Sequence, residues 1–271
     1  MKTCELFQRL SGMHVALLPN EGNCGDGLIY MGFKRLCEDH FVSYTTLLDP
    51  RPASGGVLLV LACGNLCKPF HHQAARVRRY VGSFRETYLL PCSIDPSVAA
   101  VAEMLETLPS NVTIFCRERF SLEKIRPYLR NGNAIHLDDD LALMVDFEPW
   151  QRAGSGTLYA FRTDLESCGF PLPPGNMDVS LWGGSLDGEL LLRTLSEYAV
   201  IHTDRAHVGI CAALLGKETH LYPNNYHKVR GIYEQSLSGR TNVSFHATFP
   251  SATGSDEHSN TGSTGDAASA H

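Results

Sequence analysis

Residues 198–216 contain a strand, a polar turn and a helix in immediate succession. The run 198–202 (YAVIH) is rich in β-branched and aromatic side chains, which is typical of a buried parallel strand. Thr203 and Asp204 are residue types that cap helices, and the apolar run 208–215 that follows has helical character and ends at a glycine. A strand that leads through a short turn into a helix predicts an α/β fold with a parallel sheet.

The same alternation of patterns occurs along the rest of the chain. We expect strands at 14–19, 56–62, 87–91, 112–117, 134–137 and 157–162, and helices at 28–39, 70–84, 96–107, 121–129 and 188–196. Repeated units of this kind predict parallel sheets with helices on both faces.

A change in composition at residues 148–156 (EPWQRAGSG) predicts a boundary between two lobes. We therefore expect an N-terminal Rossmann-like lobe at 1–147 and a C-terminal one at 148–246. The chain has 271 residues, of which 43% are apolar, so it can bury one full core or two. Residues 247–271 contain almost no large apolar side chain and are predicted to be disordered.

The charge and the apolar runs exclude some classes of protein. A formal net charge of -6 argues against a general nucleic-acid binder. The N-terminus lacks the pattern of a signal peptide, and the longest apolar run, 57–63, is far shorter than the roughly 20 residues of a membrane-spanning helix. We therefore expect a cytoplasmic protein.

Nine scattered cysteines in a chain of this size are expected to be reduced thiols. Cys63, Cys67, His71 and His72 have spacings that a zinc ion could accept, but no second ligand pair follows at the distance typical of zinc fingers. We therefore expect buried thiols and surface histidines there and predict no metal site.

An arginine and a histidine lie where the strand at 198–202 leads into its helix. Arg205 and His207 would occupy the first helical turn, at the sheet edge where α/β proteins bind ligands. A helix N-terminus favours an anion, and Arg205 adds a planar donor suited to carboxylate or phosphate. His207 can carry a proton near neutral pH. The alternative is that Asp204 caps the helix and both side chains face solvent.

The glycine-rich turn at 20–27 (NEGNCGDG) follows the first predicted strand. Its glycines allow close backbone approach, so its amides could hold an anion or sugar hydroxyls. The turn matches neither the Walker loop nor the dinucleotide fingerprint. Asn23 and Asp26 are the side chains that we expect to contact an acceptor sugar, whereas the alternative is a tight turn in which Asp26 caps the next helix.

Further basic residues follow other predicted strands. Arg117, in the segment CRERFS, lies at a carboxyl strand edge with Ser121 as the expected cap of the next helix. A further strand is predicted after the helix at 208–215, and Lys228, which follows that strand, could add positive charge for a phosphate. Arg162 and Asp164 also follow a strand, where a salt bridge is as plausible as a ligand contact.

The stretch 70–85 is basic and amphipathic. It could associate peripherally with an anionic membrane surface or bind a pyrophosphate lipid, although such a run is more often the solvated face of a helix.

Taken together, these segments resemble the polysaccharide pyruvyl transferase family over residues 12–240. The resemblance depends on the turn with Asn23, Gly25 and Asp26, on CRERFS, on YAFRTDLES and above all on TDRAHVGICAALLGKETHLYPNNYHKVRGIYEQSL. The chain departs from the family pattern at Ala62-Cys63-Gly64, where three glycines are common, and at Ala206, where leucine is usual.

The resemblance implies a two-lobe fold similar to the GT-B glycosyltransferases, with the acceptor on the N-terminal lobe and the donor on the C-terminal lobe. It implies transfer of the enolpyruvyl group of phosphoenolpyruvate to a sugar as a cyclic ketal, in exopolysaccharide or cell-surface glycan synthesis. The acceptor would be a sugar or a lipid-linked oligosaccharide, and phosphoenolpyruvate would serve as donor substrate without a further cofactor. Arg117, Arg205 and Lys228 would bind the donor, while His207, aided by Arg205, would transfer protons.

Two alternatives stay open from the sequence. A nucleotide-sugar-dependent glycosyltransferase of GT-B type would have similar architecture, although no acidic residue in the second half is evidently placed for a ribose. A non-catalytic glycan-assembly subunit could retain the same fold, because a fold does not determine function.

Overall fold

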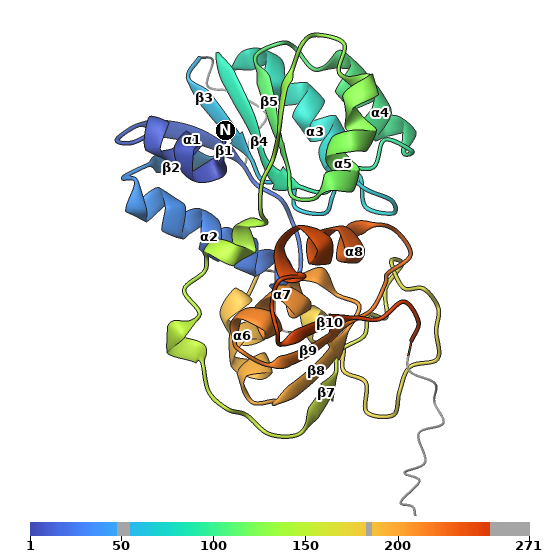
Figure 1. The fold of residues 1–271 in the computed structure, drawn as a ribbon. Helices are drawn as coiled ribbons and strands as arrows, with labels where there is room; N and C mark the ends of the chain where they lie inside the picture. The colour runs from blue at the N-terminus through green and yellow to red at the C-terminus, as the bar shows by residue number, and fades with distance from the viewer. Residues whose placement is uncertain (48–54, 183–185, 250–271) are drawn as a thin grey trace, which may run out of the picture.

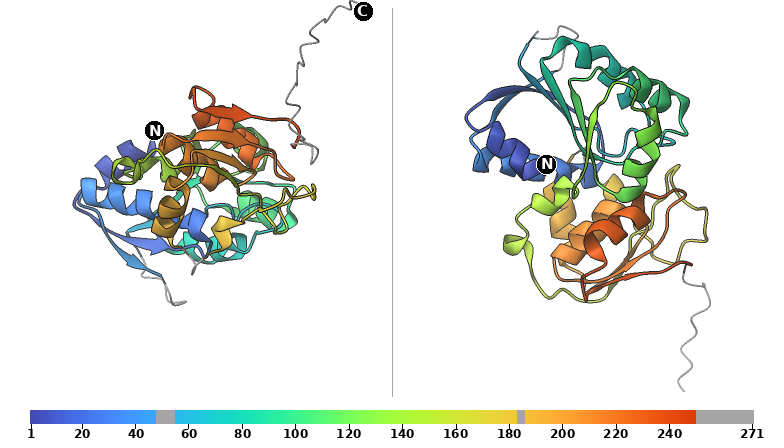
Figure 2. Two further views of the ribbon diagram at one scale, coloured as in Figure 1. Left: turned by 90° about the horizontal axis from the view of Figure 1, so that it is seen from below. Right: turned by 45° about the horizontal axis from the view of Figure 1, so that its top comes forward.

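The computed structural model describes residues 1–47, 55–182 and 186–249 and has two α/β lobes (Figures 1 and 2). The larger lobe contains a parallel sheet of six strands in the order β2-β1-β3-β4-β5-β6, and the smaller contains a parallel sheet of four strands in the order β10-β9-β8-β7. Both sheets are parallel throughout, so the predicted α/β class and the two-lobe arrangement are confirmed.

The first sheet consists of β1 (His14–Leu18), β2 (Ser43–Thr46), β3 (Val57–Val60), β4 (Glu86–Cys92), β5 (Val112–Cys116) and β6 (Ala134–Leu137). The second consists of β7 (Thr157–Tyr159), β8 (Val200–Thr203), β9 (Glu218–Leu221) and β10 (Val243–Phe245). The helices are α1 (Thr3–Arg9), α2 (Cys24–Asp39), α3 (Gln73–Tyr80), α4 (Ala99–Thr107), α5 (Arg119–Ile125), α6 (Gly188–Ser196), α7 (Ala206–Leu214) and α8 (Lys228–Ile232).

Four of these helices and strands were not expected from the sequence pattern: α1, β2, α8 and β10. Strand β2 (SYTT) lies at the sheet edge and alternates between exposed and half-buried residues, so it lacks the apolar run that indicates a central strand. Strand β10 has only three residues, at the edge of the second sheet.

The larger sheet is covered on both faces, which explains the unbroken apolar character of its central strand β3. Val57 and Leu59 pack with α1 and α2, whereas Leu58 and Val60 pack with α3 and α4 on the other face. Neighbouring side chains in a strand point to opposite faces, so a strand buried on both sides is apolar at every position.

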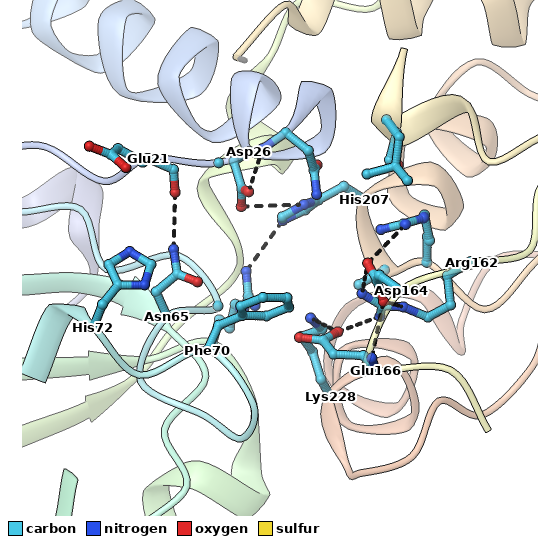
Figure 3. A pocket seen from close by; sticks show the side chains of 18 residues that line it. Glu21, Asp26, Asn65, Phe70, His72, Arg162, Asp164, Glu166, His207 and Lys228 are labelled. Carbon is cyan, nitrogen blue, oxygen red and sulfur yellow. Dashed lines mark hydrogen bonds and ion pairs between the residues drawn. The ribbon is translucent and has the colours of Figure 1, made fainter. Parts of the chain in front are cut away.

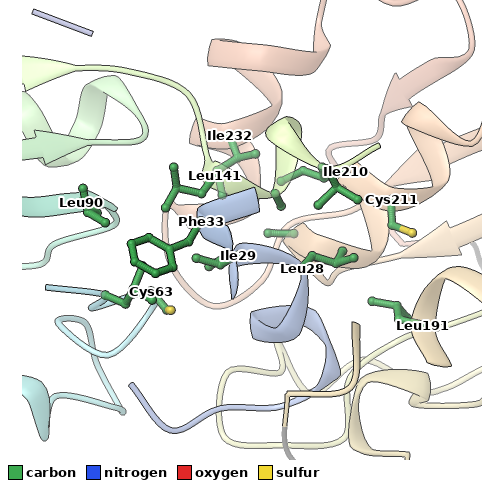
Figure 4. Close-up of a cluster of buried hydrophobic side chains, with 14 of the residues drawn as sticks. Leu28, Ile29, Phe33, Cys63, Leu90, Leu141, Leu191, Ile210, Cys211 and Ile232 are labelled. Atoms are coloured by element: carbon green, nitrogen blue, oxygen red, sulfur yellow. The ribbon is translucent and has the colours of Figure 1, made fainter. Parts of the chain in front are cut away.

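Helix α2 lies between the lobes and joins their cores (Figures 1 and 4). Its Leu28 and Phe33 belong to one buried cluster that also includes Leu191 of α6 and Ile210 of α7. A Cβ atom on Gly27 would lie 2.5 Å from the backbone nitrogen of Gly188, so this close approach of α2 to α6 requires glycine. The lobes therefore share buried apolar surface that holds them together.

The segment between the sheets, 138–156, includes the short 3-10 helix η3 (Leu141–Met144), which packs against α2. Beyond β10, the ring of Phe249 contacts Phe161, Phe170 and Tyr222. Residues 250–271, which make up most of the predicted disordered tail, lie outside the described residues. Within the described ranges, no helix combines the length and the apolar character that crossing a bilayer requires.

Candidate active site

A pocket with a volume of about 340 Å³ lies between the two lobes (Figure 3). All six residues predicted to form the site contribute to its wall: Asn23, Asp26, Arg117, Arg205, His207 and Lys228. The topology explains this convergence, because Arg117 directly follows β5 and Arg205 comes shortly after β8. Ligand sites in parallel α/β sheets lie at the carboxyl ends of the strands, and here those ends of both sheets contribute to one pocket.

Arg117 is fully buried in the N-terminal lobe and has one unsatisfied donor. Its Nη1 donates to Asp140 Oδ2 over 2.7 Å, and its Nε donates to the Ser93 hydroxyl over 2.9 Å. Among the described residues, Nη2 has no hydrogen-bond partner. An unpaired buried N–H is costly, so this nitrogen is a strong candidate to bind a ligand.

Lys228 of the C-terminal lobe approaches the same position. A Cβ atom placed on Gly64 would lie 3.5 Å from Lys228 Nζ and 3.7 Å from Arg117 Nη2, so both nitrogens lie beside this glycine. Lys228 Nζ donates to Glu166 Oε2 over 2.6 Å. Burial lowers the pKa of Lys228, while the Glu166 carboxylate opposes that effect.

Arg205 is also buried, but its guanidinium group is largely paired. Nε and Nη2 donate to the two carboxylate oxygens of Asp178 over 2.5 and 2.6 Å, and Nη2 also donates to Asp164 over 3.0 Å. Asp164 in turn accepts a hydrogen bond of 2.7 Å from Arg162, whose guanidinium also contacts Glu166. Of the two alternatives left open for Arg162 and Asp164, the salt bridge is therefore present, within a network that balances the charge of Arg205.

His207 lies between the two lobes and faces charged groups on both sides of its ring. Its Nε2 is 3.3 Å from Arg117 Nη1 and 3.5 Å from Asp140 Oδ2, and its Nδ1 is 3.9 Å from Asp26 Oδ1. Burial alone would raise the pKa of Asp140, but the charge of Arg117 and a hydrogen bond from His207 lower it below its usual value. The imidazole thus has carboxylates near both ring nitrogens.

In the glycine-rich turn at 20–27, Asn23 and Asp26 together cap α2, as in the tight-turn alternative, and binding of an anion or sugar by this turn stays a prediction. The Asn23 side chain accepts a hydrogen bond of 2.8 Å from the Gly25 amide, and Asp26 Oδ2 accepts one of 3.1 Å from the Asn23 amide. This capping box begins α2. The Gly25 amide and the side-chain oxygen of Asn23 are therefore bonded to each other. This bond weakens the expected role of Asn23 as a ligand contact.

The glycines of this turn instead make space for two titratable side chains. A Cβ atom on Gly22 would lie 2.2 Å from Asp26 Oδ2, and one on Gly25 would lie 2.9 Å from the Cβ and Nδ1 atoms of His207. Real Cβ atoms do not tolerate such contacts with packed neighbours. Gly25 therefore permits α2 of one lobe to approach His207 of the other.

Two expected helix caps are wrong. Helix α7 begins after Arg205, and Asp204 Oδ1 accepts the backbone N–H of Arg162 over 2.8 Å instead of capping that helix. Helix α5 begins after Glu118, whose carboxylate accepts the Ser121 amide. The local pattern had assigned the caps to Asp204 and Ser121. Side chains of these residue types can instead bind backbone groups elsewhere, so the local pattern alone does not determine the cap.

The possible zinc ligands at 63–72 do not converge. The thiols of Cys63 and Cys67 are buried, whereas His71 and His72 are exposed. Across residues 1–47, 55–182 and 186–249, no three His, Cys, Asp or Glu side chains are grouped to hold a metal ion. All nine cysteines lie within the described ranges and carry reduced thiols.

The basic stretch 70–85 is partly paired within the protein. Arg78 forms a 2.8 Å ion pair with Glu103, and Arg76 donates to the carbonyl of Pro19 over 2.7 Å. These contacts reduce the free positive charge of the stretch, and its contact with a membrane stays a prediction.

The sequence pattern did not single out Asp140, Glu166 or Asp178, which orient the basic groups of the pocket. All three lie in irregular segments after β6 or β7, where hydrophobic periodicity carries no information about position. The sequence offered one signal for such partners, namely an Asp or Glu a few residues from an arginine at a strand end. Of the three, only Glu166, close to Arg162, meets that criterion.

No protein-family model matches the chain, and no curated protein matches it either. The crystal structure of an uncharacterized protein from Klebsiella pneumoniae is similar to this chain, with a TM-score of 0.75 and 24% sequence identity. The similarity covers 91% of this chain and 96% of the Klebsiella chain. At this level of identity the likeness concerns the fold, which in both proteins spans the two lobes.

Proposed function

We propose that this protein is a pyruvyltransferase that transfers the enolpyruvyl group of phosphoenolpyruvate to a sugar as a cyclic ketal. The observation that carries the proposal is the position beside Gly64, where the unpartnered Nη2 of Arg117 and the Nζ of Lys228 approach each other. A phosphate group there would satisfy the buried donor and balance two neighbouring cations.

The donor also has a carboxylate, for which the C-terminal lobe offers a second basic region. Arg162 and Arg205 line the pocket, but the carboxylates of Asp164 and Asp178 compete for them. We therefore assign the phosphate to Arg117 and Lys228, and we give Arg205 the weaker role of orienting the donor carboxylate through its remaining edge. Arg117 and Lys228 thus become the main donor-binding residues, whereas the sequence pattern had suggested Arg205.

The reaction requires two proton movements. One hydroxyl of the sugar adds to C2 of the donor and a proton adds to the methylene carbon, which becomes a methyl group. The C2–O bond to phosphate then breaks, and the second hydroxyl adds to C2 and releases its proton with the phosphate. His207 supports this chemistry because it lies beside the proposed phosphate position, between Asp26 and Asp140.

The proposed setting is the cytoplasm, with a free sugar or a lipid-linked oligosaccharide of exopolysaccharide or surface-glycan synthesis as acceptor. The sequence resemblance supports this assignment, and the likeness in fold is compatible with it without adding to it.

Thermal unfolding with candidate ligands tests the donor. Phosphoenolpyruvate should raise the melting temperature at millimolar concentration, and phosphate should be released when a glycan acceptor is added. Stabilisation by UDP- or GDP-sugars without an effect of phosphoenolpyruvate would favour the glycosyltransferase alternative. Binding of glycans without phosphate release from phosphoenolpyruvate would favour the non-catalytic subunit.

A further inference from the structure

The wall of the pocket contains one phenylalanine, Phe70, which the N-terminal lobe contributes among charged and polar side chains from both lobes (Figure 3). Phe70 is half-buried, and no aromatic ring within the described residues stacks on it. A hydrophobic ring that remains accessible inside a charged pocket is available for the apolar face of a ligand.

The backbone around Phe70 holds this ring in a fixed position. The Phe70 carbonyl accepts the N–H of Cys67 over 3.0 Å, which closes a turn. Leu66 pairs with Ile94 as an isolated bridge, and the Leu66 carbonyl accepts the N–H of Asp95 over 2.9 Å. The turn is thus attached to the segment that follows β4, so the ring is presented by the sheet scaffold.

We propose that Phe70 is the platform for the acceptor sugar, so that the ligand on this wall is a pyranose with one C–H-rich apolar face. This inference rests on the proposed function, since it assigns the acceptor side of the same pocket. A pyranose has an apolar face that packs on an aromatic ring and hydroxyls at its edge that need polar partners.

Asp26 provides the polar partner for those hydroxyls. Its Oδ2 accepts the Asn23 amide, while its Oδ1 lies 3.9 Å from His207 Nδ1, which is too far for a direct hydrogen bond. In Figure 3, Asp26 and His207 lie close together on one side of the cavity and Phe70 on another. A sugar on Phe70 would place a hydroxyl between the carboxylate and the imidazole, where it can be deprotonated.

Removal of the ring should therefore weaken the acceptor and leave the donor unaffected. For Phe70→Ala we expect the acceptor KM to rise about tenfold, with kcat and the phosphoenolpyruvate-induced thermal shift close to wild type; tenfold corresponds to about 1.4 kcal/mol. Phe70→Tyr retains an aromatic face and should remain close to wild type. Phe41→Ala removes a phenyl ring that is 81% exposed and lies outside the pocket wall, so it serves as the matched control.

A binding measurement separates this inference from the proposed reaction. Saturation-transfer NMR with methyl glucoside, galactoside and mannoside should show transfer to the C–H protons of one sugar face in wild type, Phe70→Tyr and Phe41→Ala. The signal should disappear in Phe70→Ala. Equal saturation in wild type and Phe70→Ala, or saturation of the base protons of UDP with none on any pyranoside, would overturn the inference. Failure of phosphoenolpyruvate alone to bind would instead contradict the donor assignment.

Discussion

Arg117 and Arg205 occupy comparable positions in the two lobes, yet their surroundings differ. Both follow strands of a parallel sheet, both are buried and both line the pocket. Arg205 has two carboxylate partners, Asp164 and Asp178, whereas Arg117 has one, Asp140, and retains an unpartnered Nη2. The local partners of an arginine at a strand end therefore decide whether one of its donors stays available to a ligand.

The largest expected effect concerns Arg205, the arginine with two carboxylate partners. Asp178→Ala would leave Arg205 buried with Asp164 as its remaining carboxylate partner, and loss of one member of a buried ion pair costs about 3 kcal/mol or more. Urea unfolding should show this loss of stability. Asp39→Ala, which removes an exposed 3.7 Å ion pair with Arg35, is the control and should cost less than about 0.5 kcal/mol. Similar losses in both variants would show that Arg205 does not depend on Asp178.

The next effect concerns the arginine with the free donor. Arg117→Lys keeps the charge near Asp140 but removes Nη2, so phosphoenolpyruvate should bind about 100-fold more weakly in a calorimetric titration. Arg205→Lys should weaken this binding less, because its guanidinium is already engaged by carboxylates. The opposite order of the two effects would contradict the assignment of the phosphate to Arg117. Arg79→Lys, on the exposed face of α3, controls for a general effect of the substitution.

His207 connects the two regions, and its position depends on Gly25. Gly25→Ala would place a Cβ atom 2.9 Å from the His207 ring, so the imidazole must shift. We expect turnover to fall about tenfold and the free energy of unfolding to fall by about 1–3 kcal/mol, because rotation of the imidazole cannot relieve the contact with the Cβ atom of His207. Steady-state kinetics and thermal unfolding measure the two effects. Gly82→Ala, where a Cβ atom meets nothing within 4 Å, should leave both unchanged.

The sequence was sufficient to predict which residues gather, because parallel strands bring their carboxyl ends to one edge. Arg117, Arg205 and Lys228 each follow a predicted strand, and all three line the pocket. The capping turn before α2 was anticipated only as an alternative, with Asp26 as the cap, whereas in the structure Asn23 is the N-cap and Asp26 completes the capping box.

The partners of these residues could not be predicted in the same way. Asp140 and Asp178 lie in segments between 138 and 182 that have little regular structure, so their positions depend on tertiary packing. The glycines at 22 and 25 were interpreted through their amides, whereas the structure uses their missing side chains. Such a role becomes visible only when the opposite lobe is placed against the turn.

The smallest expected effect is the dependence of stability on pH, to which a carboxylate in each lobe contributes with opposite sign. Burial raises the pKa of Asp204, next to Arg205, to about 6, whereas Arg117 overcomes the effect of burial and lowers the pKa of Asp140. Because the folded-state pKa of Asp204 lies above the unfolded value, the native state binds more protons between about pH 4 and pH 6, and stability falls as pH rises through that window. Asp140 has the opposite sign: it contributes stability above about pH 4 that is lost as pH falls further.

Asp204→Asn should remove the first dependence, because the amide oxygen can still accept the Arg162 N–H but does not titrate. Relative to this variant, the wild-type free energy of unfolding should fall by about 0.8 kcal/mol between pH 5.5 and pH 7, as measured by urea denaturation at the two pH values. Parallel pH profiles of the two proteins would show that Asp204 keeps an ordinary pKa. In that case Asp140 alone of the two carboxylates would make stability depend on pH, and the predicted opposite signs in the two lobes would be lost.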